Sequence, residues 1–458
     1  MSAARSPRSP RRTTAVAVLA AAALVAVPAV AVAAGQHADN TSAARHAITG
    51  GKARNVILLI GDGMGDSEIT IARNYQVGAA GRLAMDKLPL TGAYTTYAVQ
   101  KADPTLPDYV TDSAASGSGW STGHKTYNGA ISVLPDGTPV PTILELAKRA
   151  GYRTGDITTA ELQDATPAVL ASHVVNRDCK GPDAMATCAV NAVENGGAGS
   201  IAEQLVNTGP DVLLGGGKQY FDQTVHAGSF AGQSVLSQAQ AKGYQVVTDA
   251  TALAAVHPGG KVLGTFAPNN MDLEWVGPAA SPTGTPSSTC TVNPARTASQ
   301  PHLSQMADKA ISLLDKESRG KRKGFFLQIE GASIDKQDHA ANACGQIGEH
   351  VEFDKAVQRA LDYQRSHPDT LVVVTADHGH TSQIVGAGSL TTGATVTLRT
   401  HDGADMTISY ATAPLSGSQQ HTGTEVRIAA GGPQAANVLG VTDQTDLFFT
   451  MRRALGLG

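Results

Sequence analysis

Short runs rich in apolar and β-branched residues recur along the chain, and several stop abruptly at a polar or glycine-rich turn. Runs of this length and composition predict strands, and continuous apolar runs predict strands that are buried on both faces. The six runs that we interpret as strands are residues 55–60, 154–159, 211–214, 325–330, 371–375 and 426–430. We therefore expect an α/β fold with a large central, mostly parallel sheet and helices on both of its faces.

Three segments depart from this pattern. Residues 277–297 are rich in Pro, Ser and Thr and predict a loop. Residues 385–418 combine Gly, Thr and Ser with short alternating runs, which predicts a small inserted loop or β region. Residues 443–449 predict the start of a C-terminal amphipathic helix that an Asp caps at its N-terminus.

The first 34 residues have the composition of a secretory signal peptide, because four Arg precede an apolar run at 15–27 and small residues follow it. An uncleaved membrane anchor is the alternative, since residues 15–34 are nearly long enough to span a bilayer. Pro28 and the weakly hydrophobic alanines favour cleavage, after which we expect no stable membrane insertion. The Arg11-Arg12 pair leaves the twin-arginine export route open. Residues 35–51 are polar and small and predict an exposed arm before a folded domain at 52–458.

Composition sets limits on size and partners. With 458 residues, 16% charged and 4% aromatic residues and 49 Gly, the chain is an Ala/Gly-rich globular protein that can bury one large core or two smaller ones. Its net charge of -4 gives no reason to expect nucleic acid as a partner. Cleavage would remove four of 35 basic residues and none of 39 acidic ones, leaving -8. An anionic substrate must then be attracted by local positive charge.

The cysteines agree with export to an oxidising compartment. Four cysteines allow three pairings, and none has the C-x-x-C spacing of a zinc thiolate site. Local spacing favours Cys179 with Cys188, which leaves Cys290 with Cys344. We expect two disulfides.

Candidate metal ligands follow three of the expected strands. Asp377-His378-Gly379-His380 comes directly after the strand at 371–375, and such oxygen and nitrogen donors suit a divalent metal. A polar turn with a surface His pair is the alternative. Asp62 follows residues 55–60 in a G-D-G-M-G-D loop, where the central carboxylate favours a cation over a dinucleotide pyrophosphate, although an Asx turn stays possible. Glu330 ends the strand at 325–330.

Two further pairs have ligand spacing. If Asp335 opens a helix, Asp335 and His339 lie one turn apart on one face, as in zinc sites, and Lys336 adds a cation beside them. Asp164 and Thr166 offer two hard oxygens that suit magnesium, and equally a turn before a helix. Neither pair is specific alone, and His421 is either a last ligand or a surface His.

The segment that begins at Asp112 and Ser113 offers a site for an anion. Either residue can cap the small-residue helix that follows, which is the commoner reason to find it there. A Ser at a helix N-terminus also meets free N–H groups and can hold a phosphate. Arg177 beside Cys179 would supply a bidentate clamp for phosphate oxygens.

The strand-end positions of Asp62, Glu330 and Asp377 decide between these alternatives. Parallel strands present their carboxyl ends at one edge of an open sheet, where ligands bind. We therefore expect these groups, the Asp335/His339 pair and Ser113 to form one multi-metal site.

The motifs together resemble the bacterial alkaline phosphatases, in the same order from about residue 52 to the C-terminus, so that 52–458 is expected to be an alkaline phosphatase domain. The matching segments are Asp62-Gly63-Met64-Gly65, Asp112-Ser113-Ala114-Ala115-Ser116, Asp164-Ala165-Thr166, Glu330-Gly331-Ala332-Ser333-Ile334-Asp335, Asp377-His378-Gly379-His380 and His421-Thr422-Gly423. Gly379, where close relatives often have Ala, is a departure that touches no ligand.

The resemblance implies two zinc ions and one magnesium ion. The first zinc would be held by Asp62, Asp377, His378 and Ser113. The second would be held by Asp335, His339 and His421. Magnesium would be held by Asp62, Asp164, Thr166 and Glu330. Arg177 would clamp the phosphate and Lys336 would reach it through water, while Asp112 and His380 would lie behind the ligands, with His380 orienting a carboxylate. The resemblance also supports both disulfides, export to the periplasm or outside the cell, and a homodimer.

We therefore expect a phosphomonoesterase with broad specificity, in which Ser113 forms a phosphoserine intermediate and inorganic phosphate is the product. A sulfatase or a phosphodiesterase on the same scaffold is a rival reading. A sulfatase would want a modifiable Cys in C-x-P-x-R, whereas Ser113 lies in D-S-A-A-S. A non-enzymatic exported binder of phosphate or zinc is the remaining alternative, which predicts binding without turnover.

Overall fold

The computed structural model describes Met1, residues 41–414 and residues 417–458. Apart from Met1, the expected signal peptide at 1–34 falls outside the described residues, so its boundary stays a prediction. Within the expected arm at 35–51, α1 spans Thr41–Ala47, and Arg45 and His46 are exposed. The arm is therefore partly helical, which its composition did not indicate.

A ten-stranded sheet forms the centre, in the order β17-β2-β16-β12-β1-β11-β5-β6-β8-β7. In this sheet order, each strand from β12 to β7 is parallel to the next one, and β16 is antiparallel to both of its neighbours. All six expected strands are present, so the mostly parallel sheet is confirmed. The strands are β1 Asn55–Gly61, β2 Leu90–Thr95, β5 Arg153–Glu161, β6 Val212–Gly216, β7 Tyr244–Val247, β8 Lys261–Thr265, β11 Phe325–Gly331, β12 Thr370–Ala376, β16 Val426–Gly431 and β17 Gly440–Asp443.

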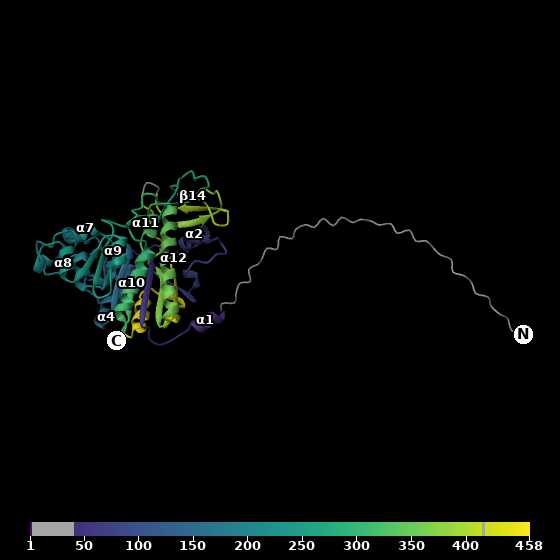
Figure 1. Cartoon of the computed structure of the whole chain (residues 1–458). Helices are drawn as coiled ribbons and strands as arrows, with labels where there is room; N and C mark the ends of the chain where they lie inside the picture. Colours follow the sequence, from purple (N-terminus) through teal and green to yellow (C-terminus); the bar gives the residue numbers. More distant parts are fainter. Residues whose placement is uncertain (2–40, 415–416) are drawn as a thin grey trace. The chain divides into compact units, whose positions relative to one another are not determined.

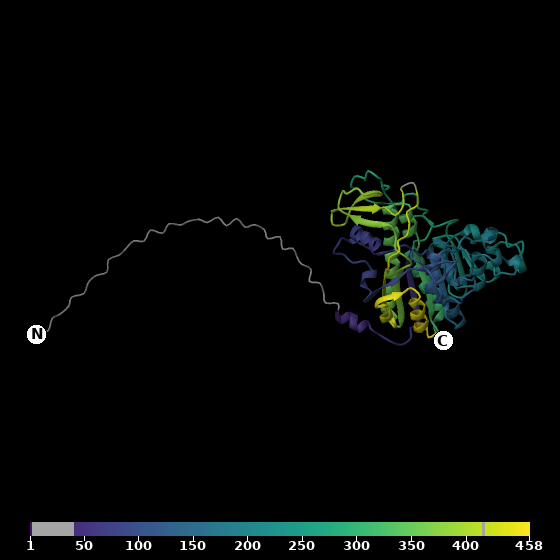
Figure 2. The same cartoon turned by 180° about the vertical axis from the view of Figure 1, so that it is seen from behind.

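Helices cover both faces of this sheet. The long helices α10 (Leu303–Ser318) and α12 (Ala343–Ser366) pack together on one face (Figure 1). The C-terminal helix α13 (Asp446–Leu455), yellow in the view from behind, packs with α3 (Ser113–Thr122) and α4 (Ile143–Arg149) over β1 and β11 (Figure 2). Every residue of β1, β11 and β12 is buried as a result.

The remaining helices are short. They are α2 Asp66–Val77, α3 Ser113–Thr122, α4 Ile143–Arg149, α5 Ala165–Ala171, α6 Ile201–Thr208, α7 Lys218–Phe221, α8 Val235–Ala241, α9 Ala250–Ala255 and α11 Ser333–His339, with 3-10 turns at Met85–Lys87, Pro182–Asn191, Val193–Asn195, Gly228–Phe230 and Ala435–Val438. In the part of the chain that the structure describes, no helix is both long and apolar enough to cross a bilayer.

The expected insertion near 385–418 is a three-stranded antiparallel sheet of β13 (Ser382–Val385), β15 (Asp405–Tyr410) and β14 (Ala394–Arg399). The segment 277–297 is mainly a loop, although its β10 (Thr291–Val292) pairs with β9 (Trp275–Val276). A smaller hairpin joins β3 (Ala98–Val99) to β4 (Pro107–Asp108). Both expected disulfides are present, Cys179–Cys188 and Cys290–Cys344.

The expected Asp cap of the C-terminal helix is wrong. Helix α13 begins at Asp446, and its N-cap residue, Thr445, makes no side-chain capping bond. Asp443 instead ends β17, and its carboxylate accepts hydrogen bonds from the backbone N–H and the hydroxyl of Thr445. The carboxylate that looked like a helix cap therefore closes the turn that precedes the helix.

Candidate metal centre

The three strand-end donors meet at one edge of the sheet. In the sheet β1 lies between β12 and β11, and both pairings are parallel. Asp62 directly follows β1, Glu330 lies opposite Ile60 near the end of β11, and Asp377 directly follows β12. The parallel register thus places side chains more than 250 positions apart in sequence at the same edge.

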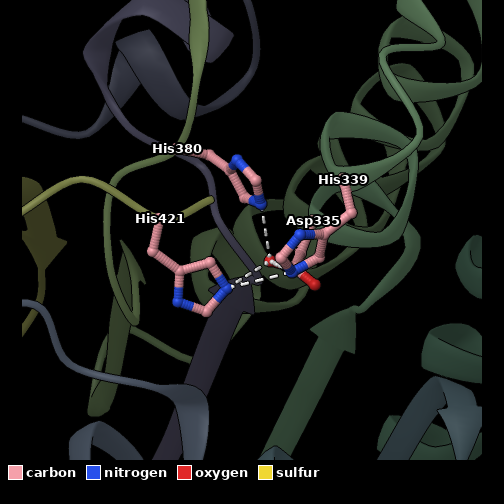
Figure 3. A group of neighbouring side chains, drawn as sticks. All are labelled: Asp335, His339, His380 and His421. Carbon is pink, nitrogen blue, oxygen red and sulfur yellow. Dashed lines mark hydrogen bonds and ion pairs between the residues drawn. The ribbon is translucent and has the colours of Figure 1, made fainter. Parts of the chain in front are cut away.

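One group of donors is formed by Asp335, His339, His380 and His421 (Figure 3). The Nε2 atoms of His339 and His421 lie 3.1 Å apart. Asp335 Oδ1 lies 3.4 Å from His339 Nε2 and 3.1 Å from His421 Nε2. On the outer side, His339 Nδ1 contacts the carbonyl of Gln419 and His421 Nδ1 contacts that of Thr111. These outer contacts orient both rings so that Nε2 faces inward, and an N–H on Nδ1 would leave the Nε2 lone pair for a metal.

The spacing of these donors fits a zinc ion. Ligand atoms about 2.0–2.1 Å from zinc in a tetrahedron lie roughly 3.3 Å from one another. Two imidazole nitrogens and a carboxylate oxygen at 3.1–3.4 Å match that spacing. His380 Nε2 is also 3.1 Å from Asp335 Oδ1, so it can orient this carboxylate or bind the same ion.

A second group is formed around His378. Its Nε2 atom lies 3.2 Å from Asp377 Oδ2, 3.5 Å from Asp62 Oδ1 and 3.3 Å from Ser113 Oγ. Ser113 Oγ is also 3.5 Å from Asp62 Oδ1. These distances again match the edge of a zinc tetrahedron. The two groups are neighbours, because His378 Nε2 is 4.0 Å from Asp335 Oδ1.

A third set of oxygens surrounds Glu330. The hydroxyl of Thr158, opposite Glu330 in the sheet, donates to one carboxylate oxygen. Thr166 Oγ1 is buried and has no hydrogen-bond partner among the described residues. Hard oxygens from Asp62, Glu330 and Thr166 suit magnesium.

Burial and mutual repulsion make this centre electrostatically costly when it is empty. Burial, followed by the charges of Asp335 and Asp377, raises the pKa of Asp62 well above its ordinary value. Burial likewise raises the pKa of Glu330 to about 8 and lowers the pKa of His378. All three shifts favour the uncharged side chain, and divalent cations would stabilise the charged carboxylates instead.

The candidate phosphate-binding side chains contact acidic partners beside the donors. Asp112 caps α3 through the N–H of Ala115 and lies 3.1 Å from Arg177 Nη1. Asp164 Oδ1 lies 3.1 Å from Arg177 Nη2, and Asp164 Oδ2 lies 2.7 Å from Lys336 Nζ. Because both oxygens of Asp164 contact cations, its role as a magnesium ligand stays a prediction.

Sequence reasoning missed several groups that hold the ligands. They are Gln419 and Thr111 through their carbonyls, Thr158, Lys180, and the pair of Ser116 and Gln444, which both donate to the carbonyl of Asp377. Only Ser116 lies in a motif that the sequence singled out. No local pattern marks the others, because each acts on a residue at least 16 positions away in sequence.

Comparison with known proteins places the same segments in one family. A sequence model described as alkaline phosphatase matches residues 53–418 and 412–457. The alkaline phosphatase of Escherichia coli is 56% identical, over 92% of this chain and 89% of that protein. The streptomycin-6-phosphate phosphatase of Streptomyces griseus is 53% identical, over 88% of this chain and 91% of that protein.

A solved structure shows the same fold. The alkaline phosphatase of the Antarctic bacterium TAB5 matches with a TM-score of 0.68 and 24% identity, and the match covers 89% of this chain and 100% of that chain. At this identity the likeness concerns the architecture of the sheet and its helices.

Proposed function

The chain belongs to the alkaline phosphatase family and is a phosphomonoesterase, and on this premise we propose that it is an exported, broadly specific enzyme that works through a phosphoserine intermediate. Small phosphomonoesters would be its substrates and inorganic phosphate its product. Two zinc ions and one magnesium ion would complete the site.

The observation that best supports bound metal is the pair of imidazoles of His339 and His421, which face each other. His339 and His421 present Nε2 atoms 3.1 Å apart beside the Asp335 carboxylate, which is the spacing of neighbouring ligands on a zinc ion. We assign one zinc to Asp335, His339 and His421. We assign the other to Asp62, Asp377, His378 and Ser113, and magnesium to Asp62, Asp164, Thr166 and Glu330. When bound, these cations would favour the Ser113 alkoxide and neutralise charge on the phosphoryl and leaving-group oxygens.

The side chains of this protein would supply the nucleophile and bind the phosphoryl group. Ser113, the first residue of α3, attacks phosphorus and forms the phosphoserine as the alcohol leaves with its oxygen. Water then cleaves the phosphoserine, which restores the hydroxyl and releases inorganic phosphate. The N–H groups of the first turn of α3 and the guanidinium of Arg177 bind phosphoryl oxygens, where negative charge accumulates. Lys336 acts through water, and His380 orients Asp335.

The residues in this scheme bind the phosphoryl group and not the rest of the ester, which supports broad specificity for the leaving alcohol. The N-terminal composition and the two disulfides support export to an oxidising compartment. We also propose a homodimer. Leu106 and Tyr109 are exposed and line one hollow, which supports an interface of this kind, and sedimentation of the purified chain at twice the monomer mass would test it.

The decisive experiment is hydrolysis of p-nitrophenyl phosphate by the purified mature chain before and after exhaustive chelation. We expect activity to be lost on chelation and restored by zinc with magnesium. Sulfate esters and phosphate diesters serve as controls for the rival activities and should turn over far more slowly. Full activity in the chelated protein would overturn the metal mechanism, and saturable phosphate binding without turnover would identify a binding protein.

A further inference from the structure

Asp164 contacts three cations, and one of them has no part in the scheme above. Asp164 Oδ1 lies 3.1 Å from Arg177 Nη2 and 3.8 Å from Lys180 Nζ, while Asp164 Oδ2 lies 2.7 Å from Lys336 Nζ. The ammonium of Lys180 and the guanidinium of Arg177 therefore share one carboxylate oxygen. Because Asp164 also caps α5 at Ala165, its position is fixed.

Lys180 is itself held by a second carboxylate. Its Nζ atom lies 2.6 Å from Glu161 Oε2, and Glu161 Oε1 accepts a hydrogen bond from Gln219. Only 19% of the Lys180 side chain is exposed. Arg177 and Lys180 stand on one short segment, which the Cys179–Cys188 disulfide ties down between them. These contacts hold the Lys180 side chain beside Asp164.

Two carboxylates attract the guanidinium of Arg177. Its Nη1 and Nη2 atoms lie 3.1 Å from Asp112 and 3.1 Å from Asp164, so these partners engage two of its five N–H donors and draw the group toward themselves. A cation placed on the same oxygen of Asp164 draws part of its negative charge away from Arg177. That cation also adds positive charge where the phosphoryl group binds.

We propose that Lys180 is a positioning residue for phosphate binding, which by contacting Asp164 keeps Arg177 available to the phosphoryl oxygens, and that Glu161 limits this effect by holding Lys180 back. The inference rests on the proposed function, in which Arg177 clamps the phosphate. It predicts opposite effects for substitutions at the two ends of the Glu161–Lys180 pair.

The test measures kcat and KM for p-nitrophenyl phosphate, and the Ki of inorganic phosphate, in the metal-loaded enzyme. Lys180→Met should raise KM and Ki together by about 5–10-fold, because the substitution weakens the binding of substrate and of product phosphate. The kcat should stay within about twofold of the original value or rise, because product phosphate is released faster. Glu161→Gln should lower Ki by about 2–3-fold, since the released ammonium can move toward Asp164.

The double variant separates a local contact from a general charge effect. If Glu161 acts through Lys180, then Glu161→Gln should not change Ki in the Lys180→Met background, whereas independent charge effects would add. Additive effects, or an unchanged Ki in Lys180→Met, would overturn the proposal. A purely structural role would lower the melting temperature and leave Ki where it was.

Lys218→Met is the matched control, because it removes one positive charge from a pair with Asp222, 2.5 Å away, outside the site. It should leave Ki unchanged. Arg177→Ala shows whether Arg177 itself binds the phosphate, separately from any role of Lys180. If Arg177→Ala leaves Ki unchanged, the proposed clamp itself is wrong. If it raises Ki and Lys180→Met does not, only the role of Lys180 is wrong.

Discussion

Ser113 combines two features that are seldom found together in a structural residue. It opens α3 with 3% of its surface exposed, yet its hydroxyl faces His378 at 3.3 Å and Asp62 at 3.5 Å and not a helix N–H. The capping role that sequence favours falls to Asp112, which accepts from Ala115 N. The Ser113 hydroxyl is therefore free to react, while the helix N-terminus around it is intact.

Replacing the hydroxyl should abolish turnover without unfolding the site. For Ser113→Ala we expect kcat for p-nitrophenyl phosphate to fall by on the order of 10³-fold or more, since the hydroxyl that forms the covalent intermediate is removed. Calorimetry should still detect phosphate binding, because Arg177 and the α3 N–H groups persist.

Ser118→Ala is the control, since Ser118 lies in the same helix and donates to the carbonyl of Ala130. It should cost stability and keep turnover. Substantial activity in Ser113→Ala would mean that water attacks the ester directly.

At the scale of elements, the site depends on segments that are held in place from outside it. Helix α4 begins near the segment that follows α5, where His173 Nε2 lies 3.1 Å from Glu145 Oε1 and His173 Nδ1 lies 2.9 Å from the carbonyl of Ser132. Glu145 also completes the capping box of α4 with Thr142. This pair joins α4 to the segment that leads on to Arg177.

The His173–Glu145 pair predicts a pH-dependent contribution to stability. Burial lowers the pKa of His173, but its bonds to Glu145 and Ser132 outweigh burial, so the pKa is raised from 6.5. Burial raises the pKa of Glu145, but His173 outweighs it, so this pKa is lowered from 4.5. The stabilisation is therefore lost as pH rises through the His173 pKa and as pH falls through the Glu145 pKa.

The melting temperature of His173→Gln should accordingly fall furthest below that of the original chain at about pH 5–6, with the difference shrinking on both sides. Glu145→Gln should show the same profile. A difference that does not vary with pH would contradict the ion pair.

The two disulfides predict different losses. Cys290–Cys344 closes 54 positions and Cys179–Cys188 only 9, so loop-closure entropy predicts losses of about 4 and about 2.5 kcal/mol in the free energy of unfolding when each pair becomes serine. Only the shorter loop adjoins Arg177. Its removal should therefore also raise KM, whereas the larger loss at Cys290 and Cys344 should leave KM unchanged. Steady-state kinetics and denaturant unfolding of both double variants would show whether the two effects separate in this way.

At the scale of the whole molecule, the centre is a concentration of buried acidic groups at one edge of the sheet. Asp62, Glu330, Asp335 and Asp377 come from three adjacent strands and the helix that follows one of them, and all are buried. Their repulsion opposes folding unless protons or cations compensate it.

Cations should therefore stabilise the entire fold and not only the site. Each site filled at 100 times its Kd adds about 2.7 kcal/mol to the free energy of unfolding. Chelation should lower the melting temperature by calorimetry, and zinc with magnesium should restore it. Calcium, which prefers more oxygen ligands, is a useful control and should restore little. An unchanged melting temperature would argue against occupied sites in the native protein.

The sequence alone determined six of the ten strands of the central sheet and which donors follow them, because burial on both faces and abrupt strand ends are local properties of the chain. It missed β2, β7, β8 and β17. It also predicted the disulfides, the small inserted sheet and the i, i+4 pair of Asp335 and His339. It misplaced the cap of α13, since a carboxylate that closes a turn and one that caps a helix look alike in sequence.

Only the tertiary structure decided which donors converge. It placed His421 against His339, turned both oxygens of Asp164 toward cations, and brought Lys180 to the same carboxylate. Distances between residues far apart in sequence are set by the order and register of strands that are not neighbours in sequence. No periodicity within one segment encodes that register.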